Sequence, residues 1–252
     1  MKFKNFTLDP FQIDSVKSIE AGNSVVVSAA TGTGKTLIAD YIIDKYLKKS
    51  RRVIYTAPIK ALSAQKYRDF CSEYGEENIG IMTGDVVVNP NAPVLIMTTE
   101  IYRNMLLTKD EIIDHVSYVV FDEIHFINDI ERGTIWEESV IFSPVHIRFL
   151  CLSATIPNAE EFAAWIQDIK KHQVDVVRYE KRAVPLNHLA YDLSLGVTTI
   201  DNVINDKEGN EFFKRKRNKG RRKNEKPQKI EHRYLIKLIE DNSHGFYLNP
   251  NK

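Results

Sequence analysis

The chain has 252 residues, of which 43% are hydrophobic and 27% charged, and 35 basic against 34 acidic side chains give a net charge of +1. These values are typical of a globular protein and argue against a wholly disordered chain, a collagen-like chain or a disulfide scaffold. No uncharged apolar run approaches the roughly 18 residues that a membrane span needs, and Asp9 and Asp14 interrupt any signal peptide. The sequence therefore predicts a soluble, cytoplasmic protein that does not enter a membrane.

The chain has two cysteines, Cys71 and Cys151, which do not form a metal-ligand pattern, and its seven histidines are scattered. We expect both thiols to be reduced, as in an intracellular protein.

From Ser24 to Tyr191, short runs of β-branched residues alternate with longer segments of helical period, which is typical of repeated βαβ units. Most of the short runs are apolar on both faces, as strands covered by helices must be. One predicted helix follows Lys35, and another follows Asn158 as its N-cap, with Glu161 completing a variant capping box. The pattern predicts an α/β fold with a mostly parallel sheet and helices on both faces. The predicted strands are Ser24–Ser28, Val53–Thr56, Ile79–Met82, Val94–Thr98, Ser117–Phe121, Ile147–Leu152 and Val174–Arg178.

The segment Ala29–Thr36 lies between the first of these strands and the helix after Lys35. Small residues and glycines let backbone N–H groups turn inward, and a helix N-terminus adds partial positive charge, so the segment predicts a phosphate-binding loop. We expect Lys35 to contact the β- and γ-phosphates of ATP, and the Thr36 hydroxyl to bind Mg²⁺. A glycine-rich turn with a chance lysine is the alternative. The loop residues expected to bind ATP are Ala30, Thr31, Gly32, Thr33, Gly34, Lys35 and Thr36.

An acidic pair, Asp122 and Glu123, directly follows an apolar strand. The carboxyl ends of parallel strands meet at the edge of the sheet where ligands bind. We expect Asp122 to hold Mg²⁺ and Glu123 to orient and deprotonate the attacking water. A pair of acids that caps the next helix is the alternative, which the phosphate-binding loop disfavours. The predicted catalytic residues are Lys35, Asp122 and Glu123.

Two hydroxyl residues, Ser153 and Thr155, follow a strand that we expect beside the Asp122 strand. Hydrogen bonds from these hydroxyls to the acidic pair would couple the nucleotide site to a bound polymer. An ordinary turn before the Asn158 helix is the alternative.

The phosphate-binding loop, the acidic segment Asp122–His125 and the segment Ser153–Thr155, in this order, resemble superfamily 2 helicases, which have a RecA-like P-loop NTPase fold. Further blocks resemble the superkiller-type DExH RNA helicases that feed RNA to the exosome. The likeness extends over residues 6–190. The additional blocks are Phe6–Gln12, Ala57–Ser63, Met82–Asp85, Met97–Ile101 and Glu131–Glu138.

The resemblance implies a role for the residues in each block. Phe6 would pack on the adenine base, Gln12 would read the edge of the base, and His125 would link the nucleotide site to a second lobe. Other blocks would grip the sugar–phosphate backbone of one strand without reading its sequence. The residues implied in this contact are Pro58, Lys60, Ala61, Gly84, Asp85, Thr98, Thr99 and Glu100.

The same resemblance implies an ATP-binding domain at residues 1–190, a basic linker or insertion at 191–230 and the truncated start of a second RecA-like domain at 231–252. The stretch Glu231–Asp241 looks like the first helix of that second lobe. In the family the second lobe supplies arginines, and such residues are worth about 10³–10⁵ in rate in related enzymes. We therefore expect this chain alone to bind ATP and to hydrolyse it slowly at best.

A basic run extends from Lys214 to Lys229, where ten Lys or Arg residues accompany one acid, Glu225. No aromatic residue lies within the run, so base stacking is not available to it. We interpret the run as a solvated insertion, with binding to RNA phosphates as the alternative.

Two alternatives to an ATP-dependent RNA helicase lobe remain open. One is a lobe of a DNA-repair helicase, which shares the acidic segment, and the other is a non-catalytic fragment that binds RNA through the basic run. The expected cofactors are ATP and Mg²⁺. The expected partners are single-stranded RNA, with DNA as a second possibility, and an exosome-type RNA decay machine.

Overall fold

The computed structural model describes residues 1–129, 132–154, 156–181, 189–192, 196–199 and 202. The chain divides into two compact units, Met1–Val184 and Pro185–Lys252. In the second unit, β11 (Leu189–Asp192) and β12 (Gly196–Thr199) form an antiparallel pair. The predicted helix Glu231–Asp241 and the basic run lie outside the described residues.

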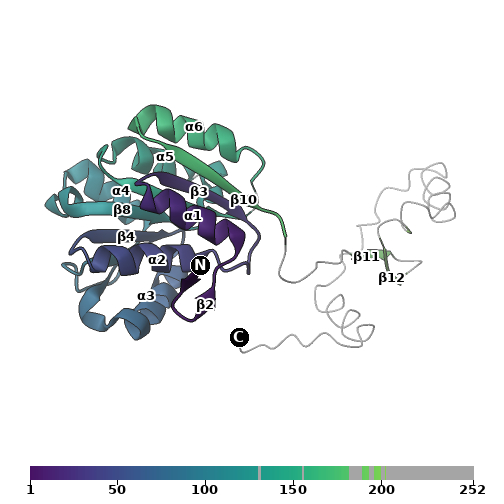
Figure 1. The fold of residues 1–252 in the computed structure, drawn as a ribbon, viewed down its shortest axis with the longest axis horizontal. Coiled ribbons are helices and arrows are strands. Elements are labelled where there is room, and N and C mark those ends of the chain that lie inside the picture. The colour runs from purple at the N-terminus through teal and green to yellow at the C-terminus, as the bar shows by residue number, and fades with distance from the viewer. Residues whose placement is uncertain (130–131, 155, 182–188, 193–195, 200–201, 203–252) are drawn as a thin grey trace, which may run out of the picture. The chain divides into compact units, whose positions relative to one another are not determined.

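An eight-stranded sheet forms the centre of the first unit (Figure 1). The strand order is β10-β3-β9-β8-β4-β7-β5-β6, and among these described strands only β6 runs antiparallel to its neighbour. All seven predicted strands are confirmed, and their ends agree to within one residue. The strands are β3 (Ser24–Ala29), β4 (Arg52–Ala57), β5 (Ile79–Met82), β6 (Val87–Val88), β7 (Val94–Thr98), β8 (Val116–Phe121), β9 (Arg148–Ser153) and β10 (Val174–Tyr179).

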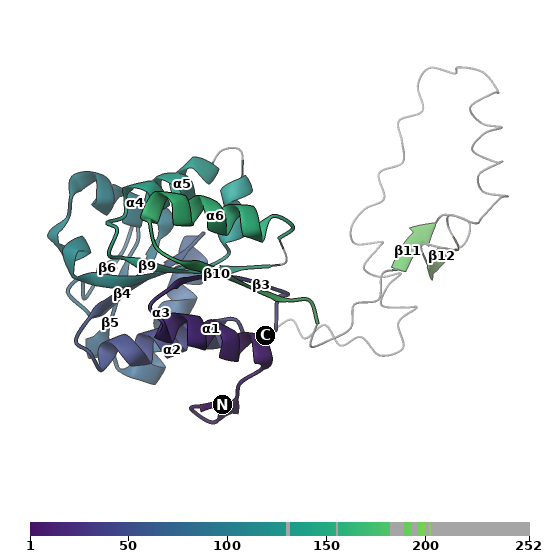
Figure 2. The same ribbon diagram turned by 45° about the horizontal axis from the view of Figure 1, so that its top comes forward.

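Three helices cover each face of the sheet (Figure 2). Successive side chains of a strand point to opposite faces, so Val25 and Val27 of β3 join one apolar cluster while Val26 joins the other. This arrangement confirms the predicted α/β fold with its mostly parallel sheet. One face is covered by α1 (Pro10–Glu20), α2 (Thr36–Leu47) and α3 (Lys60–Tyr74), and the other by α4 (Thr99–Thr108), α5 (Gly133–Phe142) and α6 (Ala159–Lys170).

A short hairpin, β1 (Lys2–Phe3) with β2 (Phe6–Thr7), precedes α1, and the sequence pattern did not predict it. The described residues contain no helix with both the length and the apolar character needed to cross a bilayer. Three short 3₁₀ helices lie in loops: η1 (Glu76–Asn78), η2 (Glu111–His115) and η3 (Ile124–Asn128).

The start of α6 corrects one expectation. Asn158 occupies the N-cap position as predicted, but its side chain caps no backbone N–H group. Its φ of −103° and ψ of 35° depart from the extended backbone that directs an N-cap side chain at the first turn. The predicted capping box with Glu161 is therefore wrong. Glu160 is the engaged acid, since its Oε1 accepts a hydrogen bond of 2.7 Å from Arg178 Nε on β10.

Candidate nucleotide and nucleic-acid site

The phosphate-binding loop connects the end of β3 to the start of α2. Gly32 and Gly34 have φ values of 82° and 81°, a left-handed conformation that side chains other than glycine's rarely adopt. Inside the loop, Thr33 Oγ1 donates a hydrogen bond of 2.7 Å to the Ala30 carbonyl. The two glycines thus turn the backbone tightly at the N-terminus of α2, where N–H groups and the helix dipole favour an anion.

Lys35 lies at the end of this loop and is only 9% exposed. Its ammonium donates to the Ala29 carbonyl at 2.5 Å and to the Ala30 carbonyl at 3.3 Å. Burial lowers the pKa of Lys35, while the charges of Glu123 and Asp122 act in the opposite direction. A desolvated cation inside a loop of this shape is suited to binding the terminal phosphates of a nucleotide.

The acidic pair follows β8, separated from β3 in the sheet by β9. Asp122 Oδ2 accepts a hydrogen bond of 2.5 Å from the Tyr55 hydroxyl, and Oδ1 accepts one of 3.0 Å from the Glu123 backbone N–H. Burial, together with the Asp122 charge, raises the pKa of Tyr55 well above its usual value, so this phenol remains a donor. The strands β3, β9 and β8 are adjacent and parallel, so the loop after β3 and the acidic pair after β8 lie at the same edge of the sheet. Both carboxylates also act electrostatically on Lys35.

The donor set at this edge fits Mg²⁺, which proteins usually hold with one or two oxygen ligands while phosphates and water supply the rest. Thr36 offers a hydroxyl at the first turn of α2, and Asp122 offers a carboxylate. Lys66 Nζ lies 3.3 Å from Thr36 Oγ1, so a second cationic side chain faces the same position. The described residues contain no cluster of three His, Cys, Asp or Glu side chains able to hold a metal without such added ligands.

Glu123 and His125 interact with each other beside this site. Glu123 Oε2 and His125 Nδ1 are 3.3 Å apart, and both atoms are buried without a hydrogen-bond partner in the described part of the chain. The His125 ring stacks on Phe126 with 5.0 Å between the ring centroids. The structure thus places His125 directly against the predicted base.

Ser153 ends β9, which lies between β3 and β8 as expected for a strand beside the Asp122 strand. Its buried hydroxyl has no hydrogen-bond partner among the residues that the structure describes, so the predicted hydrogen bond to the acidic pair is not present. Thr155 lies outside the described residues. The coupling role of both residues stays a prediction.

The two residues implied in base recognition lie on the segment before the loop. Phe6, in β2, is 59% exposed. Gln12, in α1, is buried; its Oε1 accepts from the Asp9 backbone N–H at 2.9 Å, and its Nε2 donates to the Gly34 carbonyl at 3.0 Å. Each end of a carboxamide can form a second hydrogen bond, so the amide that holds the loop retains one donor and one acceptor.

A groove of about 540 Å³ lies at the carboxyl ends of β4 and β7. Asp85 is ion-paired with Lys60, which lines the groove, and Thr99 is fully buried. Six of the eight residues implied in strand binding line this groove: Pro58, Lys60, Ala61, Gly84, Thr98 and Glu100. Segments distant in sequence thus form one surface, as the resemblance implies.

Arg132 also lines the groove, although the sequence predicted no role for this residue. Its guanidinium donates to the Pro58 carbonyl at 2.5 Å and to Glu100 Oε1 at 2.6 Å, and lies 5.6 Å from the Trp136 ring centroid. The signal that could have identified it is its position within the Glu131–Glu138 block, a short distance after the acidic pair.

Comparisons with known proteins agree with this geometry. A family model described as DEAD/DEAH box helicase matches residues 9–162. The chain is 52% identical over 186 residues to the Uncharacterized helicase C17H9.02 of Schizosaccharomyces pombe, covering 74% of this chain and 18% of that relative. It is 46% identical over 186 residues to the Exosome RNA helicase MTR4 of Mus musculus, covering 74% of this chain and 18% of that relative.

Among solved structures, the helicase Lhr of Mycobacterium smegmatis bound to ssDNA and AMP-PNP matches with a TM-score of 0.59 and 25% identity, covering 72% of this chain and 27% of that one. The chain spans about a fifth of the length of the curated relatives it matches. With a family model over more than half of its residues and relatives named as RNA helicases, the chain belongs to the DEAD/DEAH box helicase family.

Proposed function

We propose that this chain is the ATP-binding lobe of an ATP-dependent RNA helicase. The observation that supports this most directly is the buried Lys35 ammonium, which lies inside a glycine-turned loop and is acted on electrostatically by Asp122 and Glu123. A phosphoryl-transfer site needs two parts. One is a loop that binds the phosphates, and the other is an acidic pair that binds the metal ion and orients the attacking water.

In this proposal each residue has a distinct task. Lys35 neutralises the β- and γ-phosphates, and Thr36 and Asp122 hold Mg²⁺, which supplies charge neutralisation at the transferring phosphate. Glu123 orients the attacking water and accepts its proton. Its carboxylate lies beside the His125 ring. After it takes a proton from water, the Glu123 carboxyl could donate a hydrogen bond to the His125 ring.

The groove that contains Pro58, Glu100 and Arg132 would bind one strand of nucleic acid through its backbone. We favour RNA over DNA because the curated relatives, which include an Exosome RNA helicase at 46% identity, are more similar to this chain than Lhr is. The solved structure of Lhr, at 25% identity, contains ssDNA and supports the DNA alternative. We also propose that the protein acts with an exosome-type RNA decay machine and that it is located in the cytoplasm.

Strand translocation and duplex unwinding would require a second RecA-like lobe, which in this reading belongs to the complete protein. An arginine supplied across such an interface is worth about 10³–10⁵ in rate. Turnover by the complete protein should therefore exceed turnover by the 252-residue chain by a comparable factor.

Calorimetric titration with Mg-ATP tests the nucleotide site. The unaltered chain should bind with measurable heat, and Lys35→Ala should lose that binding because the phosphates lose their buried counter-charge. Lys17→Ala is the matched control, since that lysine lies on the exposed surface of α1 and forms an ion pair with Asp14. Equal binding by the unaltered chain and Lys35→Ala would contradict the proposal.

A second experiment distinguishes RNA from DNA. Stimulation of ATP hydrolysis in a complete, two-lobed protein should be greater with single-stranded RNA than with DNA of the same sequence. Stimulation by DNA alone would instead favour the DNA-repair alternative.

A further inference from the structure

The N-terminal hairpin contains a strained residue. Lys4 and Asn5 form the two-residue turn between β1 and β2, and Lys4 has a φ of 51°. Two-residue hairpin turns favour Asn and Gly at such positions, because a left-handed backbone strains other residues. Strain of this kind persists where the surrounding structure fixes the residue strongly, and it is often associated with function.

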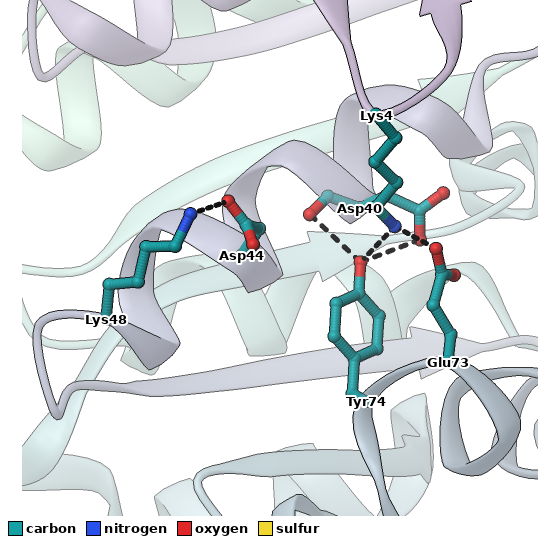
Figure 3. Close-up of polar contacts among 6 residues, drawn as sticks. All are labelled: Lys4, Asp40, Asp44, Lys48, Glu73 and Tyr74. Carbon is teal, nitrogen blue, oxygen red and sulfur yellow. Dashed lines mark hydrogen bonds and ion pairs between the residues drawn. The ribbon is translucent and has the colours of Figure 1, made fainter.

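The Lys4 side chain makes contacts that fix this turn, and Figure 3 shows it reaching toward Glu73 and Tyr74. Its ammonium is ion-paired with Glu73 and donates to the Tyr74 hydroxyl at 2.8 Å, lying 4.6 Å from the centroid of that ring. Although its charge is at the surface, the Lys4 side chain is only 25% exposed. We call Lys4, Glu73, Tyr74 and Asp40 the Lys4 cluster.

The cluster connects the hairpin to the helix that begins at the phosphate-binding loop. The Tyr74 hydroxyl contacts Asp40, lying 3.2 Å from its carbonyl oxygen and 3.4 Å from Oδ1. Asp40 lies four residues after Thr36, one turn into α2. Phe3 adds an edge-on contact with Tyr41 of the same helix, at 5.2 Å between ring centroids.

The other end of the same segment is also attached to the loop. The Leu8 backbone N–H donates to the Met1 carbonyl at 3.1 Å, which closes the hairpin, and the Gln12 amide then reaches the Gly34 carbonyl at 3.0 Å. In the sequence, Phe6 lies between Lys4, which contacts Glu73 and Tyr74, and Gln12, which contacts Gly34. It is directly opposite Phe3 in the hairpin register. Residues paired across a hairpin project from the same face, so the Phe3 contact with α2 also sets the side on which Phe6 is presented.

We infer that the Lys4 cluster positions the base-recognition segment Phe6–Gln12 relative to the phosphate-binding loop, so that Lys4, Glu73 and Tyr74 are positioning residues for the nucleotide base. This inference rests on the proposed function, because it takes the loop as an ATP site and takes Phe6 and Gln12 as the residues that contact the adenine base, as the resemblance implies. None of these three residues belongs to the phosphate-binding loop Ala29–Thr36. Their removal should weaken recognition of the base and leave recognition of the triphosphate unchanged.

The test compares two probes, Mg-ATP and Mg-tripolyphosphate, on the 252-residue chain. Lys4→Met keeps the length and apolar stem of the side chain and removes its charge. It should raise the Kd for Mg-ATP about tenfold while the Kd for Mg-tripolyphosphate changes less than about twofold. A general loss of folding would instead weaken both probes together.

The matched control is Lys48→Met, also in view in Figure 3. Lys48 lies near the end of α2, its side chain is 72% exposed, and its ion pair with Asp44 at 2.6 Å lies within one helix turn and does not involve the hairpin. Its removal should leave both Kd values unchanged.

Tyr74→Phe provides a second variant in case Lys4→Met destabilises the chain, because it removes a single hydroxyl. If the cluster acts as a unit, the double variant should lose less Mg-ATP affinity than the two single losses combined. Unchanged Mg-ATP affinity in both single variants, or an equal loss for tripolyphosphate, would overturn the inference and leave the ATP site intact. Absence of Mg-ATP binding by the unaltered chain would overturn the proposed function and this inference with it.

Discussion

Glu123 has the two properties expected of a functional carboxylate at the residue scale. Its backbone is left-handed, with a φ of 53°, and its buried Oε2 accepts no hydrogen bond from the described residues. A strained backbone and an unsatisfied buried oxygen both cost free energy, and such costs are concentrated at active sites.

We predict that Glu123→Gln binds Mg-ATP as the unaltered chain does but lowers turnover in a two-lobed protein by at least about 100-fold, the usual contribution of a general base. Calorimetry measures the binding, and phosphate release measures the turnover. Glu161→Gln, at an exposed position on α6, is the control and should change neither quantity. Normal turnover in Glu123→Gln would remove its role as the base.

Asp40 gives a prediction about pH at the same scale. Burial raises the pKa of its carboxyl to about 6, while charges on Lys4, Glu73 and Lys66 and the Tyr74 hydrogen bond modify the value. The folded chain therefore binds more protons here than the unfolded chain. The stability that this protonation contributes is fully present below the unfolded pKa and is lost as pH rises through about 6.

We predict that Asp40→Asn raises the free energy of unfolding relative to the unaltered chain at pH 8, because no charge is then buried. The gain should shrink at pH 5, where the carboxyl is already neutral. Urea unfolding at the two pH values measures the difference. A gain of the same size at both pH values would contradict the assignment.

Arg132 links two elements that border the groove. The peptide after β4 and the first turn of α4 are held by one guanidinium, through the Pro58 carbonyl and Glu100 Oε1. A planar guanidinium can bond two acceptors in fixed geometry, which a lysine ammonium reproduces poorly.

We predict that Arg132→Lys weakens binding of single-stranded RNA about tenfold, as the loss of one charge-assisted contact would. Mg-ATP affinity should remain unchanged, because the Arg132 side chain contacts Pro58, Glu100 and Trp136, which lie outside the loop. Fluorescence anisotropy with a labelled RNA measures the effect. Arg103→Lys is the control, since Arg103 pairs with Glu138 between α4 and α5 and does not line the groove. An equal loss in both variants would indicate a general change in structure.

His172 connects β3 and β9 to the loop between α6 and β10. Its Nδ1 faces Arg148 Nη1 at 3.2 Å, and its Nε2 lies 2.7 Å from Ser24 Oγ. Burial first, and then the Arg148 charge, lowers the pKa of His172 to about 4. Because the pKa of His172 is lower in the folded state, the unfolded chain binds more protons between about pH 6.5 and 4. The free energy of unfolding therefore decreases as pH falls through that range.

We predict that His172→Gln reduces this loss of stability on acidification, since glutamine offers similar hydrogen bonds without a titratable ring. Thermal unfolding followed at pH 7 and pH 5 should show a smaller drop in melting temperature for the variant. If the melting temperature falls by the same amount in the variant and in the unaltered chain, groups other than His172 cause the loss of stability on acidification.

The elements that the sequence predicted well are those whose pattern is local. β3 is buried at every position because helices cover both faces of the sheet, and its run of three valines is visible without any knowledge of its neighbours. The hairpin before α1 was not predicted, because its turn is Lys4-Asn5 and not the Asn-Gly pair that usually indicates a hairpin. The capping box at Asn158 failed because residue types do not report the backbone angles of the cap.

The site was predictable in its residue types and less so in its contacts. Spacing alone predicted roles for Lys35 and Asp122, because a phosphate-binding loop and an acidic strand end have strict local requirements. The Gln12 bond to Gly34 and the Arg132 bond to Pro58 join residues 22 and 74 positions apart. A local sequence pattern cannot contain contacts between such distant residues. The Gln12 contact with the phosphate-binding loop and the position of Arg132 in the groove were therefore found only in the structure.

At the scale of the whole molecule, the charge is unevenly distributed between the two units. The basic run Lys214–Lys229 belongs to the unit Pro185–Lys252, whereas the phosphate-binding loop, the acidic pair and the groove all belong to Met1–Val184. Because each predicted catalytic residue and the groove lie in the first unit, that unit should be sufficient for nucleotide binding.

We predict that a chain cut after Val184 has the same melting temperature and Mg-ATP affinity as the full chain, because the sheet and both apolar clusters are retained. The same comparison tests the basic run. If the run is a solvated insertion, the logarithm of the RNA association constant should fall with the logarithm of salt concentration at the same slope in both chains. If it binds RNA, the full chain should have a slope steeper by about 0.7 for each phosphate contacted. A steeper slope that persists after Lys35→Ala would favour the non-catalytic RNA-binding alternative for this part of the chain.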